Sequence, residues 1–470
     1  MTSLFKQHWY IFLLFLLLTL IFISPQLAIH APTLIDDGSD LFKAASSDYF
    51  ELFMRETFTD VRIKTLLMIY RKISFDLFGL DLSYHFLLQA VFLWVSVSAT
   101  YYLLKQNRMP IWLAMLSSIT ILIIPSTIAN YYRLGTSEQF QLLLVLLSLI
   151  FIKKRLLSLF LLVAACFFKE NSVFFLTLPI FYSLRHKQLD KTLLLQIMAL
   201  VGYYLLLIYK VFYLQDNYTS QSTMSLSNFW IAADTSPWTF AVLIVVSIFL
   251  IIKMWKKQVV VNDHIYYAFL VTIITFLIWP MNQIYYHLPS QGLAIICGTY
   301  IFFEIYQRAK MKKIVFFSLL FLYTIWIKQQ LPLAIAYGTQ LHRQHLEDSA
   351  LSKFILENNW TGYQIYSSIT AFEGNHKISM YFNEWQPANN RPAFHPHMEV
   401  WLSTHFANTD ELEQLSQKAK EDFFSNPNPQ KALVSDSKNE KTTNGSNTKI
   451  TCASSFLIKN HCRYQVTFGE

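Results

Sequence analysis

The run WYIFLLFLLLTLIFISPQLAI, from Trp9 to Ile29, is almost wholly apolar. At about 1.5 Å per residue, its roughly 21 residues would form a helix long enough to cross a hydrocarbon core about 30 Å thick. A cleavable signal would have a shorter apolar region followed by small residues, so we interpret this run as a retained anchor. It therefore predicts an integral membrane protein.

The composition agrees with this prediction. Hydrophobic residues make up 54% of the 470 residues and charged residues 14%, whereas soluble domains have about 25% charged residues. The mean hydropathy of +0.33 is modest for a multi-pass chain, so a polar portion, the last third, must dilute the apolar one. The net charge of +8 requires no nucleic acid as a partner, because cytoplasmic loops of membrane proteins carry an excess of Lys and Arg.

Ten further apolar segments follow the first, which predicts about eleven membrane helices. Two of them, 156–168 and 172–184, would each reach only about 20 Å and are too short to cross separately. The later segments are 84–104, 110–129, 140–152, 156–168, 172–184, 192–214, 238–252, 265–281, 290–305 and 314–333.

The basic residues between these segments decide the orientation. If 156–168 and 172–184 are two short helices, every basic cluster falls on the cytoplasmic side, as the positive-inside rule requires. If they are one helix, the last three clusters fall outside. We therefore expect a short helical pair with Lys169-Glu170-Asn171 at its outer tip and a cytoplasmic N-terminus. The clusters are Lys105 and Arg108; 153–155; Arg185, Lys187 and Lys191; Lys253, Lys256 and Lys257; and Arg308, Lys310, Lys312 and Lys313.

This orientation predicts two parts. Residues 1–333 would form the transmembrane domain, with a first extracytoplasmic loop at 30–83 whose amphipathic spacing suggests helices at the interface. Residues 334–470 would form an extracytoplasmic α/β domain. Strands are expected at 362–369 and 377–384, a helix at 410–424 and a low-complexity loop at 435–448.

The densest chemical signal is IDDGSD, from Ile35 to Asp40, just after the first membrane helix. A desolvated carboxylate crowded by another has a raised pKa and can take a proton from a hydroxyl group. Side chains of adjacent residues in an extended segment point to opposite faces, so one of Asp36 and Asp37 would act as a general base and the other would brace it. The alternative is a solvated acidic turn or the N-cap of a following helix.

A second signal lies at the outer ends of later helices, in Arg133 to Glu138 and in Lys169-Glu170. Ionisable groups at membrane level are costly and usually mark a functional site. Arg133 and Lys169 would suit a phosphate at the depth of the lipid headgroups, and Glu138 and Glu170 could orient them. Alternatively, Arg133 only snorkels to the surface and Lys169-Glu170 forms a solvated hairpin tip.

In this order, several motifs resemble the core of the GT-C superfamily of membrane glycosyltransferases. They are the acidic pair, Phe78-Gly79, Tyr84-His85, the Arg-x-Gly-x-x-Glu of 133–138 and Lys169-Glu170. The resemblance is closest to the protein O-mannosyltransferase-like and bacterial branches and covers residues 1 to about 209. It implies inverting transfer of a sugar from a polyprenyl-phosphate donor to a hydroxyl group on a glycolipid, an envelope glycan or a protein. Asp36 or Asp37 would be the base, and Arg133 and Lys169 would hold the phosphate.

The chain departs from that pattern at two places. It has Arg62-Ile63 where the family usually has Arg-Pro, and Tyr285-Tyr286-His287 where many members have Arg-Tyr near the end of a late helix. His287 could replace that Arg as a phosphate ligand, or it could be an interfacial aromatic-belt residue. His85 is expected to be a helix-packing residue.

Two other classes remain as alternatives. An O-antigen polymerase or ligase has a similar number of helices, but it should carry its Arg and His residues in a large outer loop between late helices. The chain could also be a non-catalytic GT-C-derived binding or assembly protein. No metal site is predicted, because His395, His397 and His405 lack Cys partners or helical spacing. Cys452 and Cys462 could form a disulfide pair.

Overall fold

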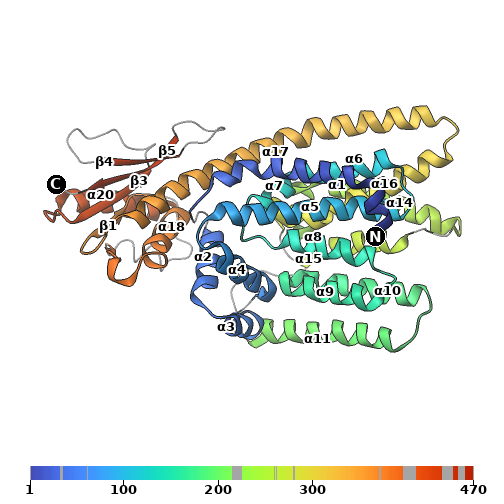
Figure 1. Cartoon of the computed structure of the whole chain (residues 1–470), viewed down its shortest axis with the longest axis horizontal. Helices are drawn as coiled ribbons and strands as arrows, with labels where there is room; N and C mark the ends of the chain where they lie inside the picture. Colours follow the sequence, from blue (N-terminus) through green and yellow to red (C-terminus); the bar gives the residue numbers. More distant parts are fainter. Residues whose placement is uncertain are drawn as a thin grey trace. The chain divides into compact units, whose positions relative to one another are not determined.

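The computed structural model (Figure 1) describes residues 2–31, 35–60, 62–213, 225–258, 260, 262–278, 281–369, 372–394, 409–436, 448–453 and 461–468. Within these residues the chain is mostly helical and has a small mixed β-sheet near its C-terminus. Its contacts divide it into two compact units. Unit 1 comprises Met1–Ile23, Ser47–Lys72 and Phe86–Gly338, and unit 2 comprises Ser24–Ser46, Ile73–His85 and Thr339–Glu470.

Three helices have residues in both units: α4 (Thr65–Phe78), α5 (Leu82–Gln106) and α17 (Lys312–Glu357). Each of the eleven predicted apolar segments contains one or more helices. The other helices of unit 1 are α1 (Thr2–Ile23), α3 (Tyr49–Met54), α6 (Ile111–Leu122), α7 (Pro125–Tyr131), α8 (Glu138–Ile150), α9 (Arg155–Phe168), α10 (Thr177–Arg185), α11 (Lys191–Tyr213), α13 (Leu226–Thr235), α14 (Pro237–Trp255), α15 (Asp263–Ile278) and α16 (Leu288–Arg308), with shorter turns η2 (Arg55–Thr59), η3 (Glu170–Leu176) and η4 (Ile284–His287).

Among the described residues, six helices are long and apolar enough to cross a membrane, or seven if the bent pair α6 and α7 is one span. The two helices of that pair meet at an angle of 57°, where Pro125 occupies the first turn of α7 and cannot continue α6. Helices α8, α9 and α15 are apolar but shorter. The chain is therefore a multi-pass membrane protein with fewer full-length spans than the eleven expected crossings.

The predicted break between the two short segments is present. Helix α9 ends at Phe168, and Lys169 has extended backbone angles, with φ −150° and ψ 119°. The chain then continues through η3 into α10. One continuous helix over residues 156–184 is excluded by this geometry, so Lys169 and Glu170 lie at a helix break.

Residues of the basic clusters lie just after the C-terminal ends of several helices. Arg108, Lys187 and Lys257 have φ of 62°, 53° and 50°, and each follows the last turn of α5, α10 or α14. Glycine usually takes this left-handed position, but the whole chain has only 11 glycines. The left-handed conformation costs each of these residues roughly 1–2 kcal/mol in backbone strain. In return, each residue places a cation near the negative end of the helix dipole.

Unit 2 contains a five-stranded sheet of order β2-β1-β3-β5-β4. Strand β1 is parallel to β2 and β3, and β5 is antiparallel to β3 and β4. The core includes Trp360, whose ring stacks on Phe468 at a centroid distance of 6.0 Å. The strands are β1 (Gln364–Ser367), β2 (Ala393–Phe394), β3 (Lys431–Asp436), β4 (Thr448–Ala453) and β5 (His461–Phe468); the helical elements that lie wholly in unit 2 are η1 (Ser24–Ala28), α2 (Ile35–Ser46), α18 (Phe372–Asn383), η5 (Ala388–Asn390) and α20 (Thr409–Ser425).

A buried polar network joins α17 to the rest of unit 2. The Lys377 ammonium lies 2.7 Å from the Asp348 carboxylate, and the Tyr464 hydroxyl donates to the same carboxylate at 3.0 Å. Asp348 is fully buried. Such a charge is tolerated inside a domain because its partners satisfy both carboxylate oxygens.

Two of the expected elements of the C-terminal part are confirmed, and one is wrong. Strand β1 lies within 362–369, and α20 covers 410–424. Residues 377–383, expected as a strand, belong to helix α18, because Ile378, Tyr381 and Phe382 are buried at the i, i+3, i+4 spacing of a helix face. Most of the expected low-complexity loop, 437–447, lies outside the described residues, as do His395, His397 and His405.

The expected division at residues 333 and 334 stays a prediction, as does the side of the membrane on which the C-terminal part lies. The contact units group the C-terminal residues from Thr339 onward with Ser24–Ser46 and Ile73–His85, two ranges that overlap the predicted first loop at 30–83. In the sheet, the backbone register pairs Cys452 with Cys462 across β4 and β5. The disulfide between them also stays a prediction.

Candidate functional site: a buried cluster of ion pairs

The acidic motif of the first loop is helical. Asp36 and Asp37 lie inside the first turn of α2, so the expectation of an extended segment is wrong, and neither residue is the N-cap that was the alternative. The partial positive charge at a helix N-terminus stabilises carboxylates there. Asp37 is fully buried and Asp40 nearly so, whereas the side chain of Asp36 lies outside the described part of the structure. Residues one position apart on a helix still point in different directions.

Lys169 and Glu138 form a buried ion pair in unit 1. Glu138 is the first residue of α8, and its Oε1 lies 2.8 Å from Lys169 Nζ. Only 7% of the Lys169 side chain and 1% of the Glu138 side chain are exposed. Burial disfavours the ammonium, but the negative charges of Glu138 and Glu170 outweigh burial and raise the pKa of Lys169. The lysine is therefore charged in a site that excludes most water.

Glu170 is held by Arg62 from the first loop. Arg62 Nε and Nη2 both donate to Glu170 Oε1, at 3.2 and 3.1 Å. Burial opposes ionisation of this carboxyl, but the positive charges of Arg62 and Lys169 lower the pKa of Glu170 to about 2. Glu170 therefore serves to hold cations rather than to accept a proton near neutral pH.

A tyrosine pair connects Arg133 to this cluster. The Arg133 guanidinium lies 5.1 Å from the centre of the Tyr285 ring, and Lys169 Nζ lies 5.1 Å from the centre of the Tyr286 ring. The two tyrosine rings are 4.2 Å apart. Asn130 of α7 donates to the carbonyl oxygen of Tyr285 at 2.8 Å and so holds η4 against α7. The structure thus brings the predicted residues Arg133, Glu138, Lys169 and Glu170 together.

Lys210 of α11 fixes the loop that carries Arg62. Its ammonium donates to the backbone carbonyl oxygens of Glu56, Asp60 and Arg62 at 3.0, 2.5 and 3.2 Å. The three N–H groups of an ammonium match three acceptors. Neither Lys210 nor the Arg62–Glu170 pair was predicted from the sequence. A lysine inside an apolar segment was the available signal, because such a residue must find partners or lie at an interface.

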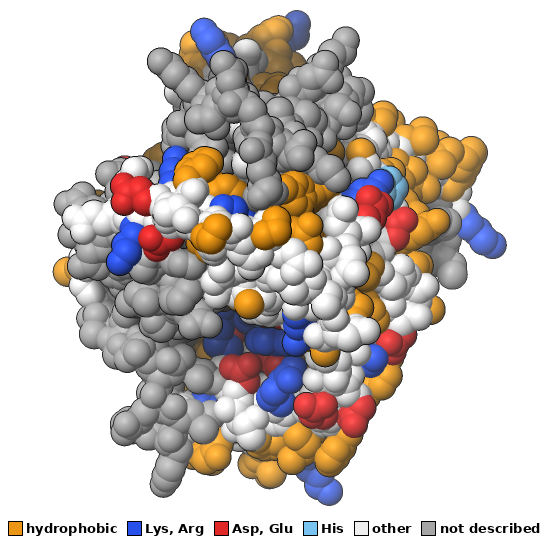
Figure 2. Space-filling view, turned by 90° about the vertical axis from the view of Figure 1, so that its left-hand side faces the viewer, with side chains coloured by type: hydrophobic (Ala, Val, Ile, Leu, Met, Phe, Trp, Pro, Cys, Tyr) orange, Lys and Arg blue, Asp and Glu red, His pale blue; other side chains and the backbone are white. Residues whose placement is uncertain are grey.

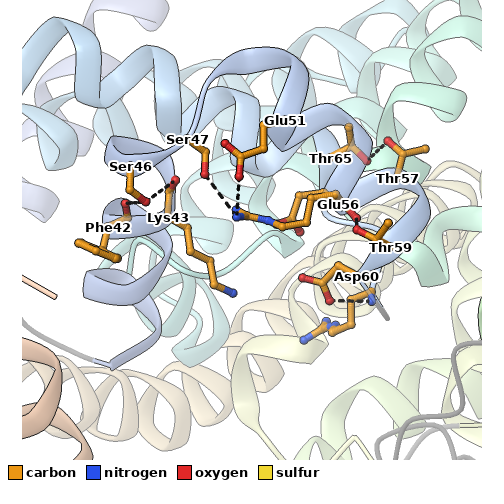
Figure 3. A network of polar contacts seen from close by, with 12 residues as sticks. Phe42, Lys43, Ser46, Ser47, Glu51, Glu56, Thr57, Thr59, Asp60 and Thr65 are labelled. Atoms are coloured by element: carbon orange, nitrogen blue, oxygen red, sulfur yellow. Dashed lines mark hydrogen bonds and ion pairs between the residues drawn. The ribbon is translucent and has the colours of Figure 1, made fainter. Parts of the chain in front are cut away.

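The same loop is held by further polar contacts (Figure 3). The Arg55 guanidinium lies within 3.3 Å of Ser47 Oγ and of Glu56 Oε1, and 3.9 Å from Glu51. The hydroxyl groups of Thr57 and Thr65 are 2.9 Å apart and join η2 to α4. These contacts order the backbone on either side of the turn that presents Arg62.

The two predicted histidines have different surroundings. His287 is fully buried, its Nε2 lies 3.0 Å from the carbonyl oxygen of Met281, and its ring packs on Phe276. This environment favours a structural role over phosphate binding. In unit 2, His85 contacts Ser74 Oγ at 2.6 Å and the carbonyl oxygen of Gly79 at 3.0 Å, as expected for a packing histidine.

Charged side chains gather in a hollow on one face of the protein. Figure 2 shows Lys and Arg side chains in the lower half of this view, with Asp and Glu side chains beside them. Among the described residues, no group of three or more His, Cys, Asp or Glu side chains is arranged to hold a metal ion.

No model of a known protein family matches the sequence, and no curated protein matches it. The fold, in contrast, is similar to that of a solved structure. The solved structure that carries this likeness is that of ArnT from Cupriavidus metallidurans in the apo state. It covers 98% of both chains with a TM-score of 0.50 and a sequence identity of 11%. At this identity the likeness concerns the fold alone.

Proposed function

We propose that this protein is a membrane glycosyltransferase that moves a sugar from a polyprenyl-phosphate donor to a hydroxyl acceptor on the extracytoplasmic face, with inversion at the anomeric carbon. The observation that carries the proposal is the cluster of Arg62, Arg133 and Lys169 with Glu138 and Glu170, in which Lys169 and Glu138 are buried and the other three are partly buried. Three cations and two carboxylates leave one positive charge in excess. A membrane protein with this fold supplies the setting in which a lipid-linked donor would be bound.

The chemistry gives the cluster a role in the transition state. The acceptor oxygen attacks the anomeric carbon, the bond from that carbon to the phosphate oxygen breaks, and the acceptor proton passes to a carboxylate. The phosphate begins as a diester with one negative charge and leaves as a monoester that gains a second. Cations placed around it therefore stabilise the transition state more than the bound donor. Glu138 takes one of the three N–H donors of Lys169, so this ammonium can also bind an oxyanion.

In this proposal, Lys169 and Arg133 bind the phosphate, as predicted from the sequence, and Arg62 joins them. Glu138 and Glu170 orient Lys169 and Arg62. His287 remains a proposed ligand of lower rank because of its contacts with Met281 and Phe276. The base is proposed to be Asp36 or Asp37, since both stand at the start of α2.

The experiment compares two buried lysines. Lys253 is also buried, pairs with Glu304 and lies 5.3 Å from an aromatic ring centre, but it belongs to a predicted cytoplasmic cluster. We expect Lys169→Met to reduce sugar transfer from a polyprenyl-phosphate sugar by about 10²-fold or more. Lys253→Met serves as the matched control and should keep most of the activity. Equal activities of the two purified, folded variants would overturn the phosphate-binding role.

Asp36→Asn and Asp37→Asn test the base in the same assay. Loss of a positioned general base typically costs about 10² to 10⁴ in rate, so one of the two variants should lose transfer to that extent while still binding the donor. If both keep full turnover, the base lies elsewhere. Mass spectrometry of envelope glycolipids and proteins from a deletion strain would identify the acceptor as the molecule that lacks a sugar. If every molecule carries the same sugars as in the wild-type strain, a non-catalytic role is favoured.

A further inference from the structure

Unit 1 contains a cavity of about 390 Å³ between α6, α14, α16 and α17. Its volume falls in the range of about 300–1,000 Å³ that is usual for ligand sites. Its wall is mostly apolar and includes Leu116, Val242, Ile295 and Phe302. The cations and carboxylates of the ion-pair cluster do not line it. The cavity adjoins that cluster through Ile284, the neighbour of Tyr285, but it has its own, mostly apolar wall.

Several polar groups of the wall are hydrogen-bonded to one another. The hydroxyls of Ser117 and Thr299 are 2.7 Å apart and join α6 to α16. Those of Thr120 and Tyr323 are 2.9 Å apart and join α6 to α17. Because these groups already have hydrogen-bond partners, they need none from a bound molecule.

The Gln291 amide extends the same pattern towards the next helix. It accepts a hydrogen bond from Ser126 at 2.6 Å and donates one to Ser236 at 2.7 Å. The interior of the cavity is consequently suited to hydrocarbon, which needs no polar partner.

Two polar lining residues differ from the rest of the wall. They are Asp234 and Gln330, which lie close in sequence to the lining residues Trp238 and Trp326. Tryptophan is enriched at the depth of lipid headgroups. Asp234 is exposed, and among the described residues no cationic side chain forms an ion pair with its carboxylate. An apolar cavity with an exposed carboxylate in its wall is complementary to an amphipathic molecule with a hydrocarbon chain and a cationic head.

We propose that this cavity binds an acyl chain of a membrane phospholipid whose headgroup carries an ammonium group, such as phosphatidylethanolamine. The chain fills the space between α6, α14, α16 and α17, and the ammonium lies near Asp234. A phospholipid with an anionic headgroup is disfavoured because Asp234 repels it. This proposal does not rest on the proposed sugar transfer.

Two glycines supply a matched pair of variants. Gly298 lines the cavity, and a Cβ added there meets no atom within 4 Å, so Gly298→Leu would place its side chain in the space that the acyl chain occupies. Gly202 of α11 is also in a candidate span, and its added Cβ also meets no atom within 4 Å, but it does not line the cavity. Gly202→Leu is therefore the control for the same change in a membrane helix.

The test uses the full-length protein in nanodiscs that contain equal amounts of phosphatidylethanolamine and phosphatidylglycerol, without any sugar donor. After release, native mass spectrometry counts and identifies the lipids retained. We expect the wild type and Gly202→Leu to retain phosphatidylethanolamine and Gly298→Leu to retain about tenfold less, because burial of several methylene groups is lost. Asp234→Asn should still retain a lipid but lose the preference for phosphatidylethanolamine.

Three results would overturn the proposal: equal retention by Gly298→Leu and Gly202→Leu, an unchanged preference in Asp234→Asn, or an isoprenoid lipid as the occupant. If Gly298→Leu does not give a monodisperse folded protein, Leu116→Trp fills the cavity from the opposite wall, on α6. Failure of sugar transfer in the donor assay would leave this result untouched, since no donor is present.

Discussion

Replacing Glu170 by Gln should weaken the decrease in folding free energy that the wild-type protein shows as the pH falls into the acid range. The pKa of Glu170 is about 2 in the folded protein and 4.5 for an ordinary glutamate. At about 1.36 kcal/mol per pH unit, this gap corresponds to roughly 3 kcal/mol of folding free energy. Because the folded-state pKa is the lower one, the stabilisation is complete above pH 4.5 and is lost as the pH falls towards 2. By about pH 3, roughly 2 kcal/mol of it should be gone.

The assay is thermal unfolding in detergent, followed by tryptophan fluorescence at a series of pH values from neutral to about pH 3. The wild-type midpoint should fall more steeply below about pH 4.5 than that of Glu170→Gln. Arg62→Met removes the main cation beside Glu170, so this variant should also lose part of the steep acid limb. Parallel curves for the wild type and Glu170→Gln would show that the Arg62–Glu170 pair does not hold this carboxylate in its ionised form, and the reasoning would be refuted.

Two further predictions concern buried cations. Lys210→Met should destabilise the protein by several kcal/mol, because three backbone carbonyls lose their donor at a typical cost of about 1–3 kcal/mol each. Limited proteolysis should also cut the loop at residues 55–64 faster than in the wild type. Equal cleavage rates would contradict the proposal that Lys210 holds this loop in place. In unit 2, Lys377→Met should cost about 3–5 kcal/mol because it leaves the fully buried Asp348 charge without its cation. The double variant with Asp348→Leu should recover part of the loss in unfolding experiments, and strictly additive effects would argue against coupling of the two groups.

The membrane helices were predictable because long apolar runs and basic clusters act locally. Hydropathy alone locates α1, α5 and α14. Arg108 and Lys257, the residues with left-handed backbone angles after α5 and α14, belong to the basic clusters from which the membrane orientation was predicted. Hydropathy does not show where an apolar segment bends, and so it does not give the length of each straight helix. The break at Pro125 and the short helices α8 and α9 reduce the number of full-length spans.

The candidate site was predictable only in part. Arg133, Glu138, Lys169 and Glu170 stood out because charges are rare in apolar sequence. Arg62 did not, because its partner Glu170 is 108 positions away and nothing in the local pattern joins them. For α18, alternation and helical spacing could not be distinguished over a few residues, so packing against the sheet decided the outcome.

The loop that carries Arg62 is secured in two chemically unlike ways. One attachment ends on the carboxylate of Glu170, which acid can neutralise; the other ends on peptide carbonyls bound by Lys210, which have no proton to gain in the ordinary acid range. Acidification to about pH 2 would thus release the guanidinium from its anchor while the polypeptide stays tethered to α11. Loss of the charge contact and loss of the loop itself are events that this protein can undergo separately.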